Sequence, residues 1–537
     1  MHRDTKKCEC AVRNFFGVMI LFYCYNTLFY TTPIQAQPAA LEIGYRSFNY
    51  DTTVIGTPTA EKPESKLWWN DGFWWGSLWD PVIDQYTIHR FDAINQSWIN
   101  TNAAIDNRSR SLSDALWDGQ HLYIVSHVFA NSGGDASSGE EGRLYRYSYD
   151  VSTTTYALEA GFPVIVNNSK SETLVLDKDS SGKLWITWTE GGKVKVNRSI
   201  ENDQTWGTPF DLPVQGMDVS SDDISAVAAF GGNKTGIMWS NQLQDTTFFA
   251  IHLDSDPDTI WQDREVALAG VVLNEEVDDH INFSTACDGS GNLYGLVKTG
   301  MGGPNDPGIL LLKRDAAGYW TQYEVSKRKD DYTRAIVIVD SENERLFVFA
   351  KSERTSHDEN IYMKVADLND LLFPVGLGTP FIQSTVYQKI NNPTSTKQCI
   401  NSTTGLLVLA SDEDSTTYVH NFITGDSLRS IEPDSIAPVI PAAFQLHPGY
   451  PNPFNSRTTL RFDIPEVSGS LVEVKIAIYN ILGQLVKNLY KEQLSAGSYE
   501  VYWNGINERG DLAASGIYFA VFTVDGFSQT RKLILLR

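Results

Sequence analysis

The sequence predicts an all-β protein: a seven-bladed β-propeller followed by a small Ig-like β-sandwich. Its 537 residues include 40 Gly, 21 Pro and 12% aromatic residues, a composition that suits strands joined by tight turns. A four-strand unit recurs along most of the chain, and alternating strand patterns return near the C-terminus. Heptads and long helical patterns are missing from the sequence. A chain of this length exceeds one ordinary core, so we expect several domains.

The propeller is predicted from a repeat of about 50 residues between positions 66 and 422. Its clearest copy reads SETLVLDKDSSGKLWITWTEGGKVKVNRSIENDQTW. That copy has a Gly- and Asp-rich turn, an aromatic second strand, and a Trp where the fourth strand opens. Counting the copies favours seven blades, with six or eight as alternatives.

The last copy lacks an obvious fourth strand, and the alternating residues 41–51 offer a replacement from the other end of the chain. Closing the ring in this way removes an open sheet edge. We therefore expect a propeller domain over residues 37–428, with the N-terminal strand in the last blade.

The N-terminus has the pattern of a secretory signal peptide. Residues 1–14 are basic overall, residues 15–30 are apolar, and Ile34-Gln35-Ala36 resembles a small-residue cleavage site. The apolar run of about 16 residues is short for a membrane span, so a membrane anchor is the less favoured alternative. We expect a signal peptide over 1–36 and no transmembrane segment in the mature chain.

The C-terminal part begins after a Pro-rich stretch at 429–442, which is typical of a linker. Residues 443–537 alternate apolar and polar positions between hairpin turns, and this predicts an Ig-like sandwich of about seven strands.

Four segments of this part closely resemble the C-terminal sorting domain of type IX secretion cargo. They are GYPNPFN at 449–455, YNILG at 479–483, SGIY at 515–518 and KLILL at 532–536. The resemblance implies export through the periplasm of a Gram-negative bacterium, with the type IX machinery as partner. It further implies secretion or attachment at the outer-membrane surface. An Ig-like stalk with no sorting role is the alternative.

Turns of the propeller resemble the Asp-box (BNR repeat) of sialidase-type propellers. The best copy is Ser199–Trp206, and weaker copies run from Asp92 to Trp98, from Asp254 to Trp261 and from Asp315 to Trp320. In that family the box is a folding element on the outer turns, so it indicates architecture. The segments at 66–72 and 278–282 are similar to those of a group of secreted propellers.

Candidate functional residues come from the channel of the predicted propeller. The first residues of the innermost strands ring one mouth of the channel, where ligand sites usually lie. Taking one residue from each blade gives Lys66, Asp114, Glu172, Asp223, His280, Arg334 and Lys397. A register slip would exchange Asp222 for Asp223 or Asp279 for His280. The ring fits a salt-bridge network that closes the fold, a binding site or a catalytic site.

As a catalytic site, the ring offers His280, Asp223, Glu172 and Asp114. Paired carboxylates serve glycoside cleavage when one stays protonated and the other is ionised, and a histidine can accept the proton in a lyase. The ligand-binding candidates are Lys66, Arg334, Lys397, Asp279, Asn282, Trp68 and Trp69. The two indoles stack on sugars or pack between blades. The three-arginine clamp of sialidases is not visible, because only Arg334, Arg108 and Arg110 are placed to help.

The net charge of −23 disfavours nucleic acid and anionic membranes as partners. No cofactor or metal is expected. The stretch Asp177–Gly182 resembles the start of a Ca²⁺ loop but lacks the closing Glu, so a Ca²⁺ site is only a weak alternative. Cys287 and Cys399 are expected to be two buried free thiols.

We therefore expect a monomeric, exported propeller that binds a glycan or a surface protein without catalysis. The alternative is a carbohydrate-active enzyme, either a polysaccharide lyase or a sialidase-like glycoside hydrolase, with its site in the channel mouth.

Overall fold

A computed structural model describes residues 41–537 except 55–56, 270–276, 288, 301, 354–358, 385–388, 434–442, 450–451, 456, 466–470, 495–496 and 525. The expected signal peptide at 1–36 lies outside the described residues, as do most of the expected linker and two residues of the GYPNPFN segment. The described helices are short, η1 (Arg328–Asp330) and α1 (Gly425–Arg429). None of them has the length and apolar character needed to cross a bilayer.

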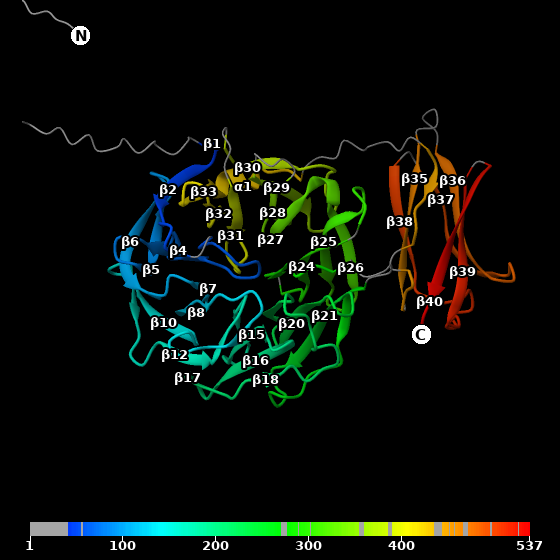
Figure 1. Ribbon diagram of the computed structural model, residues 1–537. Helices are drawn as coiled ribbons and strands as arrows, with labels where there is room; N and C mark the ends of the chain where they lie inside the picture. Colours follow the sequence, from blue (N-terminus) through cyan, green and yellow to red (C-terminus); the bar gives the residue numbers. More distant parts are fainter. Residues whose placement is uncertain are drawn as a thin grey trace, which may run out of the picture. The chain divides into compact units, whose positions relative to one another are not determined.

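The described strands form seven sheets that follow one another around a ring in chain order, from blue to yellow in Figure 1. This arrangement is a seven-bladed β-propeller, and it confirms the predicted fold class. Each sheet is one blade, and its first strand lies nearest the central channel.

The first four blades contain these strands. Blade 1 is β3 (Leu67–Asn70), β4 (Phe73–Asp80), β5 (Gln85–Asp92) and β6 (Ser97–Ala104). Blade 2 is β7 (Ser111–Trp117), β8 (His121–Val128), β10 (Gly142–Asp150), β11 (Thr155–Leu158) and β12 (Val164–Asn167). Blade 3 is β14 (Val175–Lys178), β15 (Leu184–Glu190), β16 (Lys193–Ile200), β17 (Asn202–Trp206) and β18 (Phe210–Asp211). Blade 4 is β19 (Ser225–Phe230), β20 (Lys234–Asn241), β21 (Thr246–Leu253) and β22 (Glu265–Ala269).

The remaining blades contain these strands. Blade 5 is β23 (Ile281–Thr285), β24 (Leu293–Lys298), β25 (Pro307–Arg314) and β26 (Trp320–Lys327). Blade 6 is β27 (Tyr332–Asp340), β28 (Arg345–Ser352), β29 (Asn360–Asp367) and β30 (Thr379–Ser384). Blade 7 is β31 (Ile390–Thr394), β32 (Leu406–Asp412), β33 (Thr417–Ile423) and β2 (Tyr45–Asn49). A two-stranded sheet of β9 (Gly134–Asp135) and β13 (Ser169–Lys170) lies beside blade 2.

The N-terminal strand is divided between two blades. β2 pairs with β33 at the outside of blade 7, while β1 (Leu41–Ile43) pairs with β30 at the outside of blade 6. Gly44 separates the two strands at φ +94°, and a Cβ on it would lie 2.8 Å from the backbone oxygen of His420. Only glycine meets both conditions without strain. The first strands of the chain thus cover the edges of its last two blades.

Large aromatic side chains fill the spaces between blades. Trp68 is 1% exposed, and its Nε1 donates a hydrogen bond of 2.9 Å to the hydroxyl of Tyr156 in blade 2. Trp69 is partly buried and packs edge-on against Trp74 at 5.7 Å. The buried ring of Trp68 therefore packs between blades, and a sugar cannot reach it without a rearrangement.

One of the Trp-bearing outer turns ties blade 4 to the blade before it. Trp261 after blade 4's third strand packs on Trp185 of blade 3, with ring centroids 5.9 Å apart. In the same turn, Asp258 accepts hydrogen bonds from Lys183 and Arg198 of blade 3. Because these contacts are made on the outer part of the blades, they support the ring without entering the channel.

Cys287 and Cys399 form a disulfide, with Cα atoms 6.0 Å apart. The prediction of two free thiols is therefore wrong. The two residues are 112 positions apart in the chain, but one follows the innermost strand of blade 5 and the other follows that of blade 7. Innermost strands converge near the axis of a propeller, so residues remote in sequence come within bonding distance there.

The C-terminal domain is a sandwich of two sheets, which confirms the predicted Ig-like fold. One sheet contains β34 (Gln445–Leu446), β35 (Thr458–Ile464) and β38 (Gly497–Trp503). The other contains β37 (Leu485–Leu494), β36 (Val472–Asn480), β39 (Gly516–Val524) and β40 (Phe527–Leu535). Alternate residues of the strands face a shared core around Phe462, Ile476, Trp503 and Phe522.

Candidate functional site

Residues 57–66, here called the channel segment, run inside the ring of blades as part of the blue chain in Figure 1. All but Thr57 are buried, although the sequence TPTAEKPESK is rich in charge. Its backbone and hydroxyls contact several blades: Thr59 Oγ1 lies 2.8 Å from Ser411 Oγ in blade 7, and Asn282 Nδ2 in blade 5 donates to the oxygen of Lys62 at 2.9 Å. A cavity of about 10 Å³ remains beside Glu64, room for about one water molecule.

The charged residues of the channel segment pair with the predicted ring. Lys62 Nζ donates to Glu172 Oε1 at 2.6 Å and to Asp279, while Arg334 Nη1 donates to Glu61 Oε2 at 2.7 Å. These five residues, with His280, are here called the mouth cluster. They join the segment to blades 3, 5 and 6. The sequence analysis missed this role, because a short charged stretch between strands is typical of a solvated loop.

The mouth cluster shifts the pKa of its members in opposite directions. Burial raises the pKa of Glu172 to about 7, against the lowering effect of Lys62. Burial would also raise the pKa of Asp279, but the hydrogen bond and charge of His280, together with Lys62, hold it well below its usual range. Burial opposes the charge on Lys62, and the carboxylates of Asp279 and Glu172 outweigh that effect and raise its pKa. The pKa values of two neighbouring carboxyl groups, Glu172 and Asp279, are thus shifted in opposite directions.

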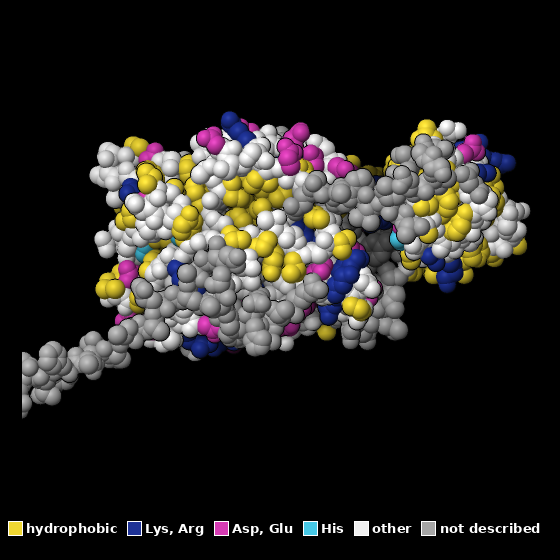
Figure 2. Space-filling view, turned by 90° about the horizontal axis from the view of Figure 1, so that it is seen from above, with side chains coloured by type: hydrophobic (Ala, Val, Ile, Leu, Met, Phe, Trp, Pro, Cys, Tyr) yellow, Lys and Arg dark blue, Asp and Glu magenta, His cyan; other side chains and the backbone are white. Residues whose placement is uncertain are grey.

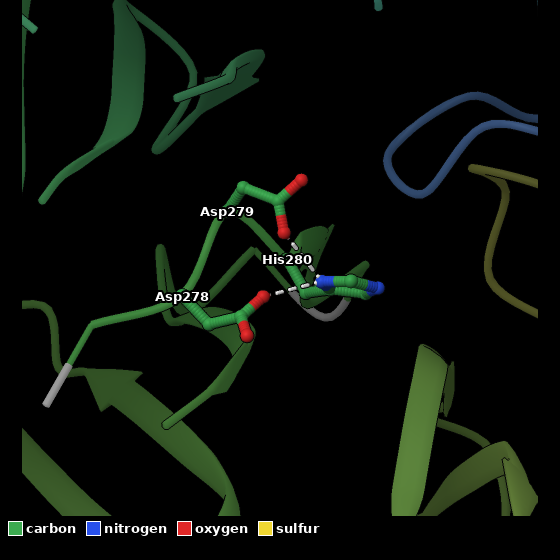
Figure 3. A group of neighbouring side chains, drawn as sticks. All are labelled: Asp278, Asp279 and His280. Atoms are coloured by element: carbon green, nitrogen blue, oxygen red, sulfur yellow. Dashed lines mark hydrogen bonds and ion pairs between the residues drawn. The ribbon is translucent and has the colours of Figure 1, made fainter. Parts of the chain in front are cut away.

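His280 is oriented by two carboxylates (Figure 3). Its Nδ1 lies 2.6 Å from Asp278 Oδ1 and 2.7 Å from Asp279 Oδ1, and its Nε2 lies 3.1 Å from the hydroxyl of Thr333 in blade 6. The two carboxylates therefore fix the orientation of the imidazole, as they do for histidines that transfer protons in catalysis.

A second, deeper set of residues holds neighbouring blades together. Asp114 accepts a hydrogen bond from the N–H of Leu176 at 2.8 Å, Asp177 from that of Ala229 at 2.7 Å, and Asn282 from that of Val337 at 2.9 Å. In each case an innermost strand binds the innermost strand of the next blade. We call Asp114, Asp177 and Asn282 the inner clamps.

The inner clamps correct the register of the predicted ring. Asp114 is the fourth residue of β7, whereas Glu172 precedes β14 by three residues, so the two do not occupy equivalent positions. Asp114 corresponds to Asp177, and it also accepts hydrogen bonds from the N–H of Ser65 at 2.8 Å and from Lys397. Burial raises the pKa of Asp114, and Lys397 opposes that shift.

The other predicted ring residues also have defined partners. Lys66 Nζ donates to Glu64 Oε2 at 2.8 Å, and Glu64 Oε1 lies 2.7 Å from His127 Nε2. Burial would raise the pKa of Glu64, but Lys66 and His127 lower it to about 2. Asp223 accepts hydrogen bonds from the N–H groups of Ser220 at 2.7 Å and Gln242 at 3.1 Å, so it shapes the approach to blade 4. Its exposed neighbour Asp222, the alternative in the register, faces the mouth cluster instead.

Accessibility separates the mouth from the deeper channel. The side chains of Asp278, Lys298 and Arg334 are 23%, 26% and 28% exposed, while those of Asp114 and Lys66 are 0% and 1% exposed. Arg108, a possible helper of Arg334, is committed to Asp106 at 2.6 Å. A ligand therefore reaches the mouth without displacing the channel segment, but it cannot reach the deeper residues.

The surface of the propeller carries mixed charge. On the face drawn in Figure 2, Lys and Arg side chains lie in small groups beside Asp and Glu.

Comparison with known proteins gives one family match and several similar folds. The model of the FlgD Ig-like domain matches residues 455–525. The polysaccharide lyase Uly1 has a TM-score of 0.38 and 9% identity, covering 68% of this chain and 90% of that chain. An exo-β-1,3-galactanase from Phanerochaete chrysosporium has a TM-score of 0.30 and 9% identity, covering 86% and 96%. No curated protein has a significantly similar sequence. At these values the similarity extends no further than the fold.

Proposed function

We propose that this chain is an exported recognition protein whose propeller binds a glycan or a surface protein at the channel mouth. The observation that carries the proposal is the filled channel: Glu172 and Arg334 of the predicted ring pair with the channel segment, and Lys397 pairs with Asp114 of another blade. Accessible groups of both signs remain at the mouth, in Asp278, Lys298 and Arg334. Such groups suit the hydroxyls and carboxylates of sugars or polar side chains of a protein.

Binding is favoured over catalysis in the deeper channel for an energetic reason. Breaking a buried ion pair by removing one partner costs about 3–5 kcal/mol, because the other charge stays buried and unpaired. A substrate that used Asp114 or Lys66 would have to break such pairs first. These two residues therefore support the fold in our proposal.

Export through the type IX system is the second part of the proposal. Its support is the resemblance of four C-terminal segments to the sorting domain, together with the Ig-like sandwich that carries them. The disulfide between Cys287 and Cys399 suits an oxidising compartment outside the cytoplasm. The test is the location of the full chain in a type IX-competent bacterium. We expect it outside the cell or on its surface, and we expect periplasmic retention when residues 443–537 are deleted or the system is inactivated.

A carbohydrate-active enzyme is the second candidate, favoured by the chemistry of the mouth cluster. Glu172 and Asp279 differ in acidity, and His280 is oriented by two carboxylates. In a lyase reaction, Nε2 would take the proton beside a uronate carboxylate while the bond to the leaving oxygen breaks. A protonated Glu172 would return a proton to that oxygen. This route requires Lys62 to leave Glu172.

One experiment separates the two candidates. The purified full chain is titrated calorimetrically with neutral, uronate-containing and sialylated glycans, and products are followed by reducing ends and ultraviolet absorbance. Binding without turnover, weakened at least about tenfold by Arg334→Ala, supports recognition at the mouth. The matched control is Lys193→Ala on the outer part of blade 3, which should bind normally. Turnover abolished by His280→Ala would replace recognition with catalysis, and unchanged binding in Arg334→Ala would move the site elsewhere.

A further inference from the structure

Three carboxylates from three successive blades converge at the channel mouth. Glu172 of blade 3, Asp222 before blade 4 and Asp279 before blade 5 each offer an oxygen, and the three oxygens lie within 4.8 Å of one another. Two of these residues are buried and Asp222 is exposed. Like charges at this separation raise each other's energy unless a cation lies between them.

The neighbouring lysine compensates only part of this charge. Lys62 Nζ contacts one oxygen of Glu172 and one of Asp279. The second oxygen of Glu172, Oε2, is buried and has no hydrogen-bond partner among the described residues, although Glu172 is only 7% exposed. In the same described part of the chain, no ion pair involves the carboxylate of Asp222. Among the described residues, Glu172 Oε2 thus has no hydrogen-bond partner and Asp222 has no ion-pair partner, whereas both oxygens of Asp279 are engaged by Lys62 and His280.

The charge balance around the cluster is negative. Among the described residues, Glu61 and Asp278 lie beside the three carboxylates, and their ion pairs are with Arg334, Lys298 and His280. Five carboxylates therefore face three permanently charged cations, Lys62, Arg334 and Lys298, together with His280. A divalent cation would correct the imbalance.

We propose that Glu172, Asp222 and Asp279 form a Ca²⁺ site at the channel mouth, beside Lys62. The donors are all carboxylate oxygens, which hard cations prefer. They come from three separate blades, and two of them share Lys62, so the geometry is irregular. Ca²⁺ tolerates such geometry and completes its shell with water, whereas Mg²⁺ demands a near-ideal octahedron. The ammonium of Lys62 opposes the ion, so we expect weak binding, in the range of about 10⁻⁴ to 10⁻³ M found in extracellular modules.

The Asp177–Gly182 hairpin is a poorer Ca²⁺ site. Asp179 Oδ1 accepts from the N–H groups of Ser181 and Lys183 at 2.9 Å, and its Oδ2 accepts from Trp185 Nε1 at 2.8 Å. Asp177 is one of the inner clamps. The carboxylates of this loop are therefore occupied by the hairpin and the next blade.

The test is a titration of the purified full chain with CaCl₂ and, separately, MgCl₂, read by calorimetry and by thermal unfolding. We expect one Ca²⁺ per chain, a higher melting temperature in Ca²⁺, and a weaker response to Mg²⁺. Asp222→Asn should weaken Ca²⁺ binding at least about tenfold without changing the melting temperature in chelator, because its side chain is exposed. Asp263→Asn, at an exposed aspartate that precedes the last strand of blade 4, is the matched control and should bind as the parent does.

A second variant tests the position of the ion relative to the lysine. Lys62→Met removes the competing ammonium, so Ca²⁺ should bind several-fold more tightly than in the parent. No heat and no melting shift up to about 10 mM Ca²⁺ would overturn the proposal, since even extracellular modules bind in that range. Unchanged binding in Asp222→Asn would overturn it equally, whether or not Lys62→Met folds. This titration contains no glycan. Failure of the Ca²⁺ site can therefore be told apart from failure of the proposed recognition function.

Discussion

The two levels of the propeller channel solve the problem of buried charge differently. At the inner clamps, Asp114, Asp177 and Asn282 accept backbone N–H groups from the next blade, and every such bond runs between adjacent innermost strands. At the mouth cluster, side chain meets side chain, and Lys62 joins blades that are not neighbours in the ring. The clamps have one arrangement because the backbone fixes the donors. The mouth cluster is held by side chains on both sides of each contact, and these side chains can change partners when a ligand binds.

The largest expected effect tests the clamp level. Asp114→Ala should lower the free energy of unfolding by about 3–5 kcal/mol, because it leaves Lys397 without its carboxylate and removes the acceptor of the Ser65 and Leu176 N–H groups. Urea denaturation of the full chain, followed by Trp fluorescence, measures the loss. A loss below about 1 kcal/mol would mean that the clamp does not hold blades 2 and 3 together.

The disulfide gives the second-largest expected effect on stability, and it belongs to neither the inner clamps nor the mouth cluster. Replacing Cys287 and Cys399 by Ser should cost about 2–4 kcal/mol, because the bond closes a loop of 112 residues in the unfolded chain. The same denaturation compares this variant with the parent, each with and without reductant. Reductant should destabilise the parent only. Equal stability in all four samples would show that the bond does not form.

Glu64 in the channel segment gives a pH-dependent effect. Its pKa in the folded chain is about 2 against an ordinary value of 4.5, so the unfolded chain binds more protons between these values. Its contribution is therefore present above pH 4.5 and is lost as the pH falls, by about 2 kcal/mol at pH 3. Unfolding measured from pH 6 to pH 3 should show this loss in the parent and a flatter profile in Glu64→Gln. Parallel profiles would contradict the assigned partners.

The smallest effect belongs to the mouth. Arg334→Ala removes a partly exposed partner of Glu61 and should cost about 1 kcal/mol or less, in contrast to Asp114→Ala. The same urea denaturation measures it, with Lys193→Ala as the surface control. A cost as large as that of Asp114 would show that the mouth cluster is as structural as the clamps, and would weaken it as a ligand site.

The sequence was sufficient for the blades because their signals are local. Strand alternation and turn residues repeat within each blade, and residues 41–51 could be assigned as strand before any partner was known. The geometry of the site, in contrast, depends on which residue of each innermost strand lies at the channel mouth. Glu172 lies before its strand and Asp114 lies within its own, and apolar patterning does not distinguish those positions. The burial of residues 57–66 depends on Glu172, Asp279 and Arg334, which lie more than 100 residues away, and the disulfide has the same long-range character.

The channel segment has a consequence for the order in which the molecule is assembled. Residues 57–66 are synthesised before every blade, yet their partners lie in blades 2, 3, 5, 6 and 7. The strands β1 and β2 likewise wait for β30 and β33, the last strands of blades 6 and 7. Contacts of such long sequence separation form slowly. The earliest blades are therefore made before most partners of the channel segment exist. The contacts that close the ring can all form only once residue 423 has been synthesised.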